Sequence, residues 1–252
     1  MRYRGREYTG AGVAVAVVDS GVDAEDPRLS GASVTGWNLS LGATGHALIG
    51  GDCGDLNGHG TDMAAAVRIL APDAQIVAVR IMDADLRTTA DLMAAGIETA
   101  YRNGARIISL SMGTPNMGKA LLLRDTCGLA AEGGAVVVAA AHPRGERAYP
   151  ADLPETVGVA AHPDCPLDKS YFFSPHRFPT SEWGHLSGKF LTHGYQRIQG
   201  QRGAFRGSGL AAAYLAGRLA CLAEALADQG PAEIVGAMQN QAFVPEPQLG
   251  YA

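Results

Sequence analysis

The apolar run Val15–Val18, which ends abruptly at Asp19 and Ser20, constrains the fold more than any other stretch of the chain. A short run of small and β-branched residues between glycines is typical of a buried strand in a parallel sheet. Asp19 would then lie at the carboxyl end of that strand, where open α/β sheets place their functional groups. An isolated Asp after a strand is usually only a turn residue, so its role depends on the rest of the chain.

Strand patterns and helix patterns alternate along the chain after Asp19. The segments predicted to be helices are 59–70, 89–102, 117–131, 208–228 and 231–239. The segments predicted to be strands are 33–38, 75–82, 106–111, 135–141, 149–161 and 188–192. Residues 41–56 are glycine-rich without periodicity and are interpreted as a loop, and the tail 245–252 as frayed. This alternation predicts an α/β fold with a mostly parallel central sheet and helices on both faces.

Length, composition and charge narrow the class of protein. A chain of 252 residues with 47% hydrophobic and 18% charged residues suits one α/β domain over residues 1–252. The net charge of −5 and the absence of Lys/Arg-rich runs argue against nucleic acid or an anionic membrane as a partner. No apolar run approaches the ~20 residues of a membrane span, and residues 1–10 lack a secretory signal. We therefore expect a soluble, cytoplasmic protein, with secretion open if another segment precedes Met1.

The cysteines and histidines do not suggest a cofactor. The four cysteines, of which Cys221 is expected in the core and Cys53 near His59, form no CxxC pair, so a reduced compartment is assumed. A catalytic role for Cys53 is disfavoured because Asp19 and a histidine between two glycines, His59, already supply the local chemistry. Four further histidines lack metal-ligand spacing and are interpreted as loop or surface residues: His162, His176, His185 and His193. We expect no metal and no cofactor.

Two later glycine-containing turns each open an alanine-rich helix. His59 lies between two glycines in NGHGT, residues 57–61, and Gly209 lies in GSGLAAAYLAG, residues 207–217. The chain order of Asp, then His, then a Gly/Ser turn is that of the subtilisin class of serine hydrolases. Over residues 8–239 the chain therefore resembles the subtilisin-like serine peptidase family.

The resemblance implies a fold and a set of roles. The fold would be the three-layer subtilisin-like arrangement, with Asp19 as the triad aspartate and His59 as the triad base. The segment Ser111-Met112-Gly113 resembles the family's SLG segment, whose backbone pairs with an extended substrate. The implied partner is a peptide or protein, and a partner subunit remains open.

The resemblance fails at two positions that matter for hydrolysis. Gly209 lies where the nucleophilic serine of GTSMA belongs, and Ser208 takes the place of the neighbouring threonine. His142 and Pro143 replace the Gly-Asn pair of AAAGN, whose asparagine donates to the oxyanion, and Pro143 has no such donor. In subtilisin itself, loss of the nucleophile costs on the order of 10⁶ in turnover, and loss of an oxyanion donor about 10² to 10³.

Three interpretations of these departures follow. The first is a pseudopeptidase, or an impaired serine peptidase, that holds an extended peptide in its cleft. The alternative is an active serine endopeptidase whose serine has been substituted at Gly209 in this chain, with His59 as base and Asp19 orienting it. A third moves the nucleophile to Ser208, but a shift of one residue at a helix start turns the side chain by about 100°. A purely structural or subunit-interaction role overlaps the first interpretation.

Overall fold

The computed structural model describes residues 1–42, 47–162, 164–172, 189–197 and 204–243. Its α-helices are α1 His59–Leu70, α2 Ala90–Arg102, α3 Ala120–Glu132, α4 Ser208–Ala225 and α5 Pro231–Gln241, and its 3-10 helices are Pro27–Leu29 and Met117–Lys119. Its strands are β1 Arg2–Tyr3, β2 Arg6–Glu7, β3 Ala14–Asp19, β4 Val34–Leu41, β5 Ala47–Gly50, β6 Gln75–Arg80, β7 Ile107–Leu110, β8 Val136–Ala140, β9 Val157–His162, β10 Ser170–Phe172, β11 Phe190–His193, β12 Tyr195–Arg197 and β13 Ala204–Arg206.

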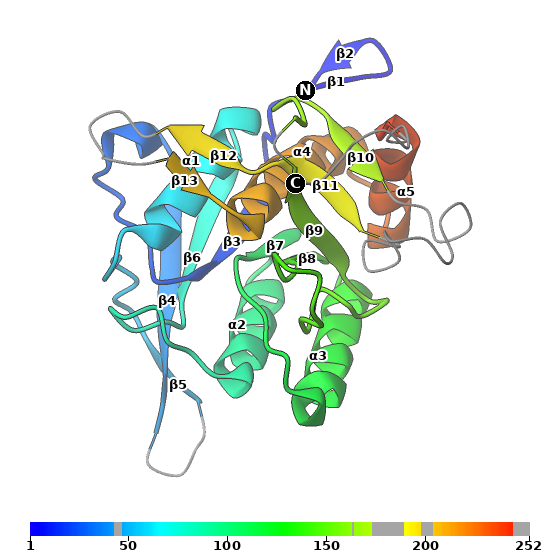
Figure 1. The fold of residues 1–252 in the computed structure, drawn as a ribbon. Coiled ribbons are helices and arrows are strands. Elements are labelled where there is room, and N and C mark those ends of the chain that lie inside the picture. The colour runs from blue at the N-terminus through cyan, green and yellow to red at the C-terminus, as the bar shows by residue number, and fades with distance from the viewer. Residues whose placement is uncertain (43–46, 163, 173–188, 198–203, 244–252) are drawn as a thin grey trace.

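A central sheet dominates the structure (Figure 1). Within the described residues it has nine strands in the order β10-β11-β9-β8-β7-β3-β6-β4-β5. All neighbouring pairs from β11 to β4 are parallel, and only the outer pairs β10–β11 and β4–β5 are antiparallel. Strand β3 lies inside the sheet between β7 and β6, as its apolar sequence predicts. The mostly parallel sheet expected from the alternating patterns is confirmed.

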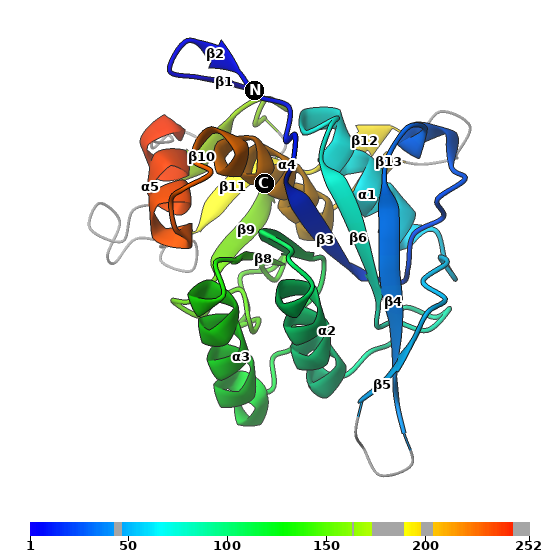
Figure 2. The ribbon, with the colours of Figure 1, turned by 180° about the vertical axis from the view of Figure 1, so that it is seen from behind.

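Helices cover both faces of the sheet (Figure 2). Val15 and Val17 of β3 belong to a buried cluster with α1, α4 and α5, whereas Ala16 and Val18 belong to a second cluster with α2 and α3. This division follows from the period of two along a strand, which sends successive side chains to opposite faces. Apart from Arg218 and its two ends, helix α4 consists of apolar and small residues, and nearly all of it is buried. Such a helix belongs inside a domain.

Helix α1 begins close against the end of β3. A Cβ added at Gly60, the second residue of α1, would lie 2.0 Å from the Gly21 carbonyl oxygen. No real side chain tolerates that distance, so glycine at position 60 permits the helix start to contact the turn that follows Asp19. The GHG sequence thereby places His59 beside the carboxyl end of β3.

Several expectations need correction. Residues 41–56 were expected to form a loop, but Ala47–Gly50 form β5, an edge strand paired with β4. His162 was interpreted as a loop or surface residue, yet it is 2% exposed at the end of β9, where its ring contacts Tyr171 edge-on at 5.4 Å. His193 ends β11, and its Nδ1 donates to the Cys165 carbonyl oxygen at 3.0 Å. His176, His185 and the tail 245–252 lie outside the described residues.

Two negative findings concern the described residues alone. None of their helices combines the length and apolar character needed to cross a bilayer. No group of three or more His, Cys, Asp or Glu side chains among them is placed to hold a metal ion.

Candidate active site

Asp19 and His59 form a direct hydrogen bond at the carboxyl edge of the sheet. The distance from His59 Nδ1 to Asp19 Oδ1 is 2.8 Å, and the Ser20 backbone N–H also donates to Oδ1 at 2.7 Å. The Asp19 side chain is 1% exposed and that of His59 is 17% exposed. Burial alone would lower the pKa of His59, but the hydrogen bond and charge of Asp19, with Asp62 and Asp55 nearby, raise it above its ordinary value. The pair therefore has the geometry of a base oriented by a carboxylate.

Ser111 forms a hydrogen bond with the second oxygen of the Asp19 carboxylate. It follows β7 directly, and its hydroxyl donates to Asp19 Oδ2. Because β7 is the sheet neighbour of β3, their carboxyl ends bring Asp19 and Ser111 together. The Asp19 carboxylate thus holds His59 on one oxygen and Ser111 on the other.

Gly209 lies in the first turn of α4 and faces Ser111. A Cβ at position 209 would meet the Ser111 Cβ at 3.0 Å and the Ser111 carbonyl oxygen at 3.1 Å. These distances are shorter than ordinary van der Waals contact, so any side chain here requires a small displacement of Ser111. Ser208, the alternative nucleophile, is 6% exposed at the start of α4. Its burial argues against attack on a bound peptide.

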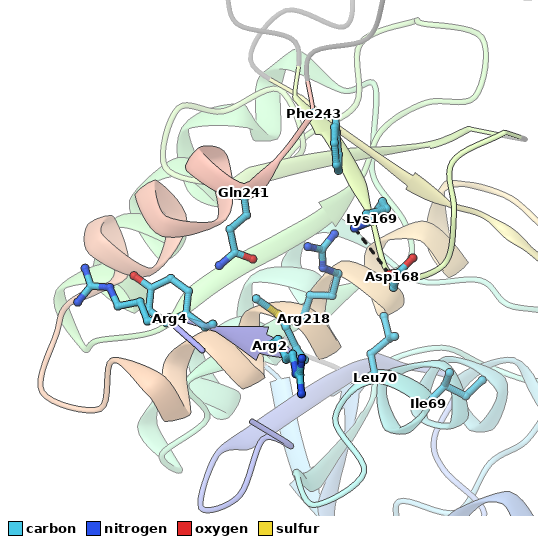
Figure 3. Close-up of a pocket in the computed structure, with 11 residues that line it drawn as sticks. Arg2, Arg4, Ile69, Leu70, Asp168, Lys169, Arg218, Gln241 and Phe243 are labelled. Atoms are coloured by element: carbon cyan, nitrogen blue, oxygen red, sulfur yellow. Dashed lines mark ion pairs between the residues drawn. The ribbon is translucent and has the colours of Figure 1, made fainter. Parts of the chain in front are cut away.

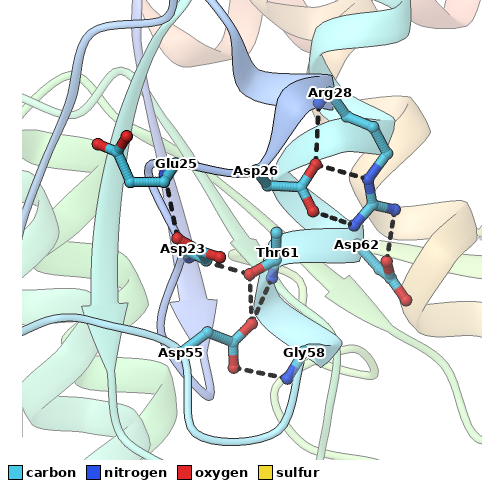
Figure 4. A network of polar contacts seen from close by, with 8 residues as sticks. All are labelled: Asp23, Glu25, Asp26, Arg28, Asp55, Gly58, Thr61 and Asp62. Atoms are coloured by element: carbon cyan, nitrogen blue, oxygen red, sulfur yellow. Dashed lines mark hydrogen bonds and ion pairs between the residues drawn. The ribbon is translucent and has the colours of Figure 1, made fainter.

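Asp55, which was not among the predicted site residues, organises the turn that carries His59. Its Oδ1 accepts hydrogen bonds from the Ser20 hydroxyl at 2.8 Å and from the backbone N–H groups of Asn57 at 3.0 Å and Gly58 at 2.9 Å. Its Oδ2 accepts from the Thr61 N–H at 2.8 Å and from the Thr61 hydroxyl, as Figure 4 shows for Gly58 and Thr61. The carboxylate caps α1 from outside, since the N-cap Gly58 has no side chain to do so.

The pKa of Asp55 reflects this arrangement. Burial raises the pKa, but the hydrogen bonds from Thr61, Asn57 and Gly58 outweigh burial and hold it below the ordinary value. The signal that could have revealed Asp55 is its position four residues before His59, in an Asp-X-Asn-Gly turn.

An ion-pair network borders the pocket next to His59. Arg28 donates to Asp26 Oδ2 at 2.9 Å and to Asp62 Oδ1 at 2.6 Å, so it joins the 3-10 helix after β3 to α1 (Figure 4). Hydrogen bonding to Asp26 raises the pKa of Arg28 despite its partial burial. The pocket has a volume of about 560 Å³ and extends from these ion pairs to His59.

The oxyanion segment, His142 and Pro143, lies in a turn after β8. His142 Nδ1 accepts from the Arg144 N–H at 3.3 Å, and its carbonyl oxygen accepts from the Gly145 N–H at 3.0 Å. His142 Nε2 lies 4.0 Å from Glu146 Oε2. The polar contacts of His142 with described residues thus stay within the turn. Pro143 offers neither a backbone N–H nor a side-chain donor.

The backbone after Ser111 is available to a ligand. Met112 and Gly113 make no backbone hydrogen bond to any residue that the structure describes, whereas the next residue, Thr114, pairs with Tyr149 in both directions at 2.9 and 2.8 Å. The free stretch therefore lies between a sheet strand and a fixed bridge, with its amide groups open.

Comparison with known proteins identifies the family of the chain. The model of the subtilase family, peptidase S8, matches residues 10–251. Thermitase from Thermoactinomyces vulgaris is 32% identical over 204 residues, which cover 71% of this chain and 70% of thermitase. Subtilisin E from Bacillus subtilis (strain 168) is 32% identical over 169 residues, or 61% of this chain and 42% of that protein.

Solved structures show the same fold. Sphericase superposes with a TM-score of 0.72 at 23% identity and covers 94% of this chain and 86% of its own. A cold adapted subtilisin-like serine proteinase gives a TM-score of 0.70 at 20% identity, covering 95% and 85% of the two chains. With the family match over nearly the whole sequence, these similarities show that the chain belongs to the subtilase family of subtilisin-like peptidases.

Proposed function

We propose that this subtilase-family chain holds an extended peptide in its cleft without cleaving it. The observation that carries the proposal is at Gly209. The residue in the serine position has no atom that can attack a carbonyl, and a side chain at position 209 would be crowded by Ser111, whose Cβ would lie 3.0 Å from the new Cβ. With Pro143 in the oxyanion segment, the chain lacks both the nucleophile and the side-chain donor of the family mechanism.

The binding half of the proposal rests on Met112 and Gly113. Their open amide groups follow the sheet strand β7, so an extended peptide can add to this edge through backbone hydrogen bonds. His59, 17% exposed and fixed by Asp19, would border the peptide rather than activate a nucleophile. The retained pair would then maintain the shape of the cleft.

A second candidate is an active endopeptidase whose serine at position 209 has been replaced. The intact hydrogen bond between His59 and Asp19 favours it, because a base with a raised pKa is what a serine at 209 would need. Restoring that hydroxyl separates the two candidates.

Peptide binding is tested by a proline substitution in the proposed edge. A peptide selected from a displayed random library against the full chain is labelled with fluorescein, and its affinity is measured by fluorescence anisotropy. Met112→Pro removes one backbone donor and should weaken binding at least tenfold. Met117→Pro is the matched control, because Met117 is an exposed first residue of a 3-10 helix, where proline is tolerated.

A second measurement distinguishes the loss of a backbone hydrogen bond from a general effect of proline on the fold. N-methylation of the peptide at alternate residues should weaken binding at every second position, as strand addition requires. Equal affinities of both proline variants, together with no effect of N-methylation, would show that the peptide does not bind as an added strand.

A further inference from the structure

Arg218 is a buried cation that the candidate active site does not use. It lies on α4, ten positions after Ser208, and is 6% exposed. Its Nη1 has no hydrogen-bond partner among the residues that the structure describes. Burial lowers the pKa of Arg218 below its ordinary value, and the nearby charges of Cys165 and Asp168 only partly oppose this effect. A buried guanidinium with an open donor requires an explanation, because buried polar groups are almost always paired.

The side chain of Arg218 points into a cavity of about 810 Å³ (Figure 3). Segments far apart in the sequence build its wall: the β1 hairpin, the end of α1, the residues before β10, and the end of α5. The cavity is therefore a product of the fold rather than of one loop. It lies at the part of α4 away from Gly209, so it is separate from the peptide cleft.

The wall of the cavity is rich in positive charge. Among the residues that the structure describes, the wall carries Arg2, Arg4 and Lys169 besides Arg218, against a single side-chain carboxylate, that of Asp168. Asp168 lies 3.8 Å from the Lys169 ammonium group, which also lies over the Phe243 ring at 5.3 Å. Arg218 therefore keeps its open Nη1 while Lys169 takes the local carboxylate.

Apolar groups share the wall with these cations. Leu70 and Phe243 lie on the wall, as does the amide of Gln241, which adds a neutral donor (Figure 3). A guanidinium group pairs best with the oxygens of a carboxylate or a phosphate. The cavity volume far exceeds that of a free inorganic anion, and its apolar wall suits a ligand with a hydrophobic body.

We propose that this cavity binds a small organic anion, with its carboxylate or phosphate group on Arg218 and its apolar part against Leu70 and Phe243. A phosphate monoester is preferred to a carboxylate, because four cations face one carboxylate and a phosphate monoester carries close to two negative charges at neutral pH. Arg2, Arg4 and Lys169 strengthen the attraction from the rim.

Isothermal titration calorimetry on the full chain tests the site with phenyl phosphate, benzoate and phenol as probes. Phenyl phosphate should bind, benzoate should bind more weakly, and phenol, which has the same ring without the oxyanion, should give no binding heat. Arg218→Met should reduce the affinity for phenyl phosphate at least tenfold. Arg124→Gln is the charge-matched control, because Arg124 is a half-exposed cation on α3, away from the cavity.

Each contrary outcome has a distinct meaning. Absence of binding by the unmodified chain, or equal weakening by Arg124→Gln, would overturn the proposal, since the latter indicates only general charge attraction. Lys169 lies at the partly exposed rim, so Lys169→Gln should weaken the binding of phenyl phosphate severalfold. This variant tests the site even if Arg218→Met fails to fold. Peptide binding to these variants should be unchanged, so this proposal and the proposed function fail independently.

Discussion

Replacing Asp55 by Asn tests how the chain fixes the turn that carries His59. The substitution keeps the size of the side chain and one carbonyl oxygen, which can still accept from Ser20, Asn57 and Gly58. The other oxygen becomes an NH₂ group that faces the N–H and hydroxyl of Thr61. Since Thr61 is only 3% exposed, water cannot readily replace the lost acceptor.

The cost can be worked out from these contacts. An unsatisfied buried donor costs about 1 to 3 kcal/mol, and loss of a helix cap adds about 1 kcal/mol. Asp55→Asn should therefore lower the free energy of unfolding by about 2 to 4 kcal/mol at neutral pH. For a chain of this size, each kcal/mol corresponds to roughly 2 to 4 °C in Tm. The expected fall in Tm is roughly 4 to 16 °C.

Thermal unfolding followed by circular dichroism measures the effect. The folded pKa of Asp55 lies below the ordinary 3.8, so its contribution is complete above that value and is lost as the pH falls through the folded pKa. The difference between the two chains should therefore shrink below about pH 3.8. Asp52→Asn is the control, because the Asp52 carboxylate is 81% exposed and its replacement should leave the free energy of unfolding nearly unchanged. A Tm unchanged by Asp55→Asn at pH 7, or a difference constant down to pH 3, would refute the reasoning.

Three further substitutions or reactions have defined outcomes. The folded pKa of His59 lies above its ordinary value, so protonated His59 stabilises the fold fully below about pH 6.5, and this stabilisation is lost as the pH rises through the folded pKa. In urea titrations, the loss of unfolding free energy caused by His59→Gln should therefore decrease from pH 5.5 to 9. Gly209→Ser should lower the free energy of unfolding by about 1 to 3 kcal/mol through overpacking against Ser111, and adding Ser111→Gly should recover part of that loss. If the losses of the two single variants simply add in the double variant, the contact between positions 209 and 111 would be contradicted. Iodoacetamide at pH 8 should alkylate the half-buried Cys53 first, while burial raises the pKa of Cys127 to about 12 and shields it; peptide mapping that finds Cys127 modified equally fast would contradict its burial.

The sheet and its helices were predictable because each carries its own local signal. The run before Asp19 has the composition of a buried strand, and the alternation of apolar residues divides β3 between two cores as the period of two requires. Strand β5 was missed because Ala47–Gly50 contain little β-branched character, and an edge strand needs only one partner. His162 was misassigned because nothing local marks a histidine at a strand end as buried.

The candidate site was predictable only in part, for reasons of distance along the chain. The motifs around Asp19 and His59 placed both residues at helix or strand ends, and their contact follows from sheet topology. The bond between Ser111 and Asp19 joins residues 92 positions apart and has no local signature. The crowding of Gly209 by Ser111 likewise appears only once β7 and α4 are packed together.

The central claim, a subtilase cleft that binds but does not cut, is tested most directly by comparing the chain with Gly209→Ser. The selected fluorescein-labelled peptide is incubated with each form, its binding is followed by anisotropy, and its integrity by mass spectrometry. We predict that both forms bind the peptide and that it is recovered intact from both, because Pro143 supplies no side-chain donor to the oxyanion and Ser111 crowds the Cβ that the substitution adds. Hydrolysis by Gly209→Ser at the expected deficit of about 10² to 10³ for the missing donor alone would contradict the claim and identify an endopeptidase that lacks only its serine.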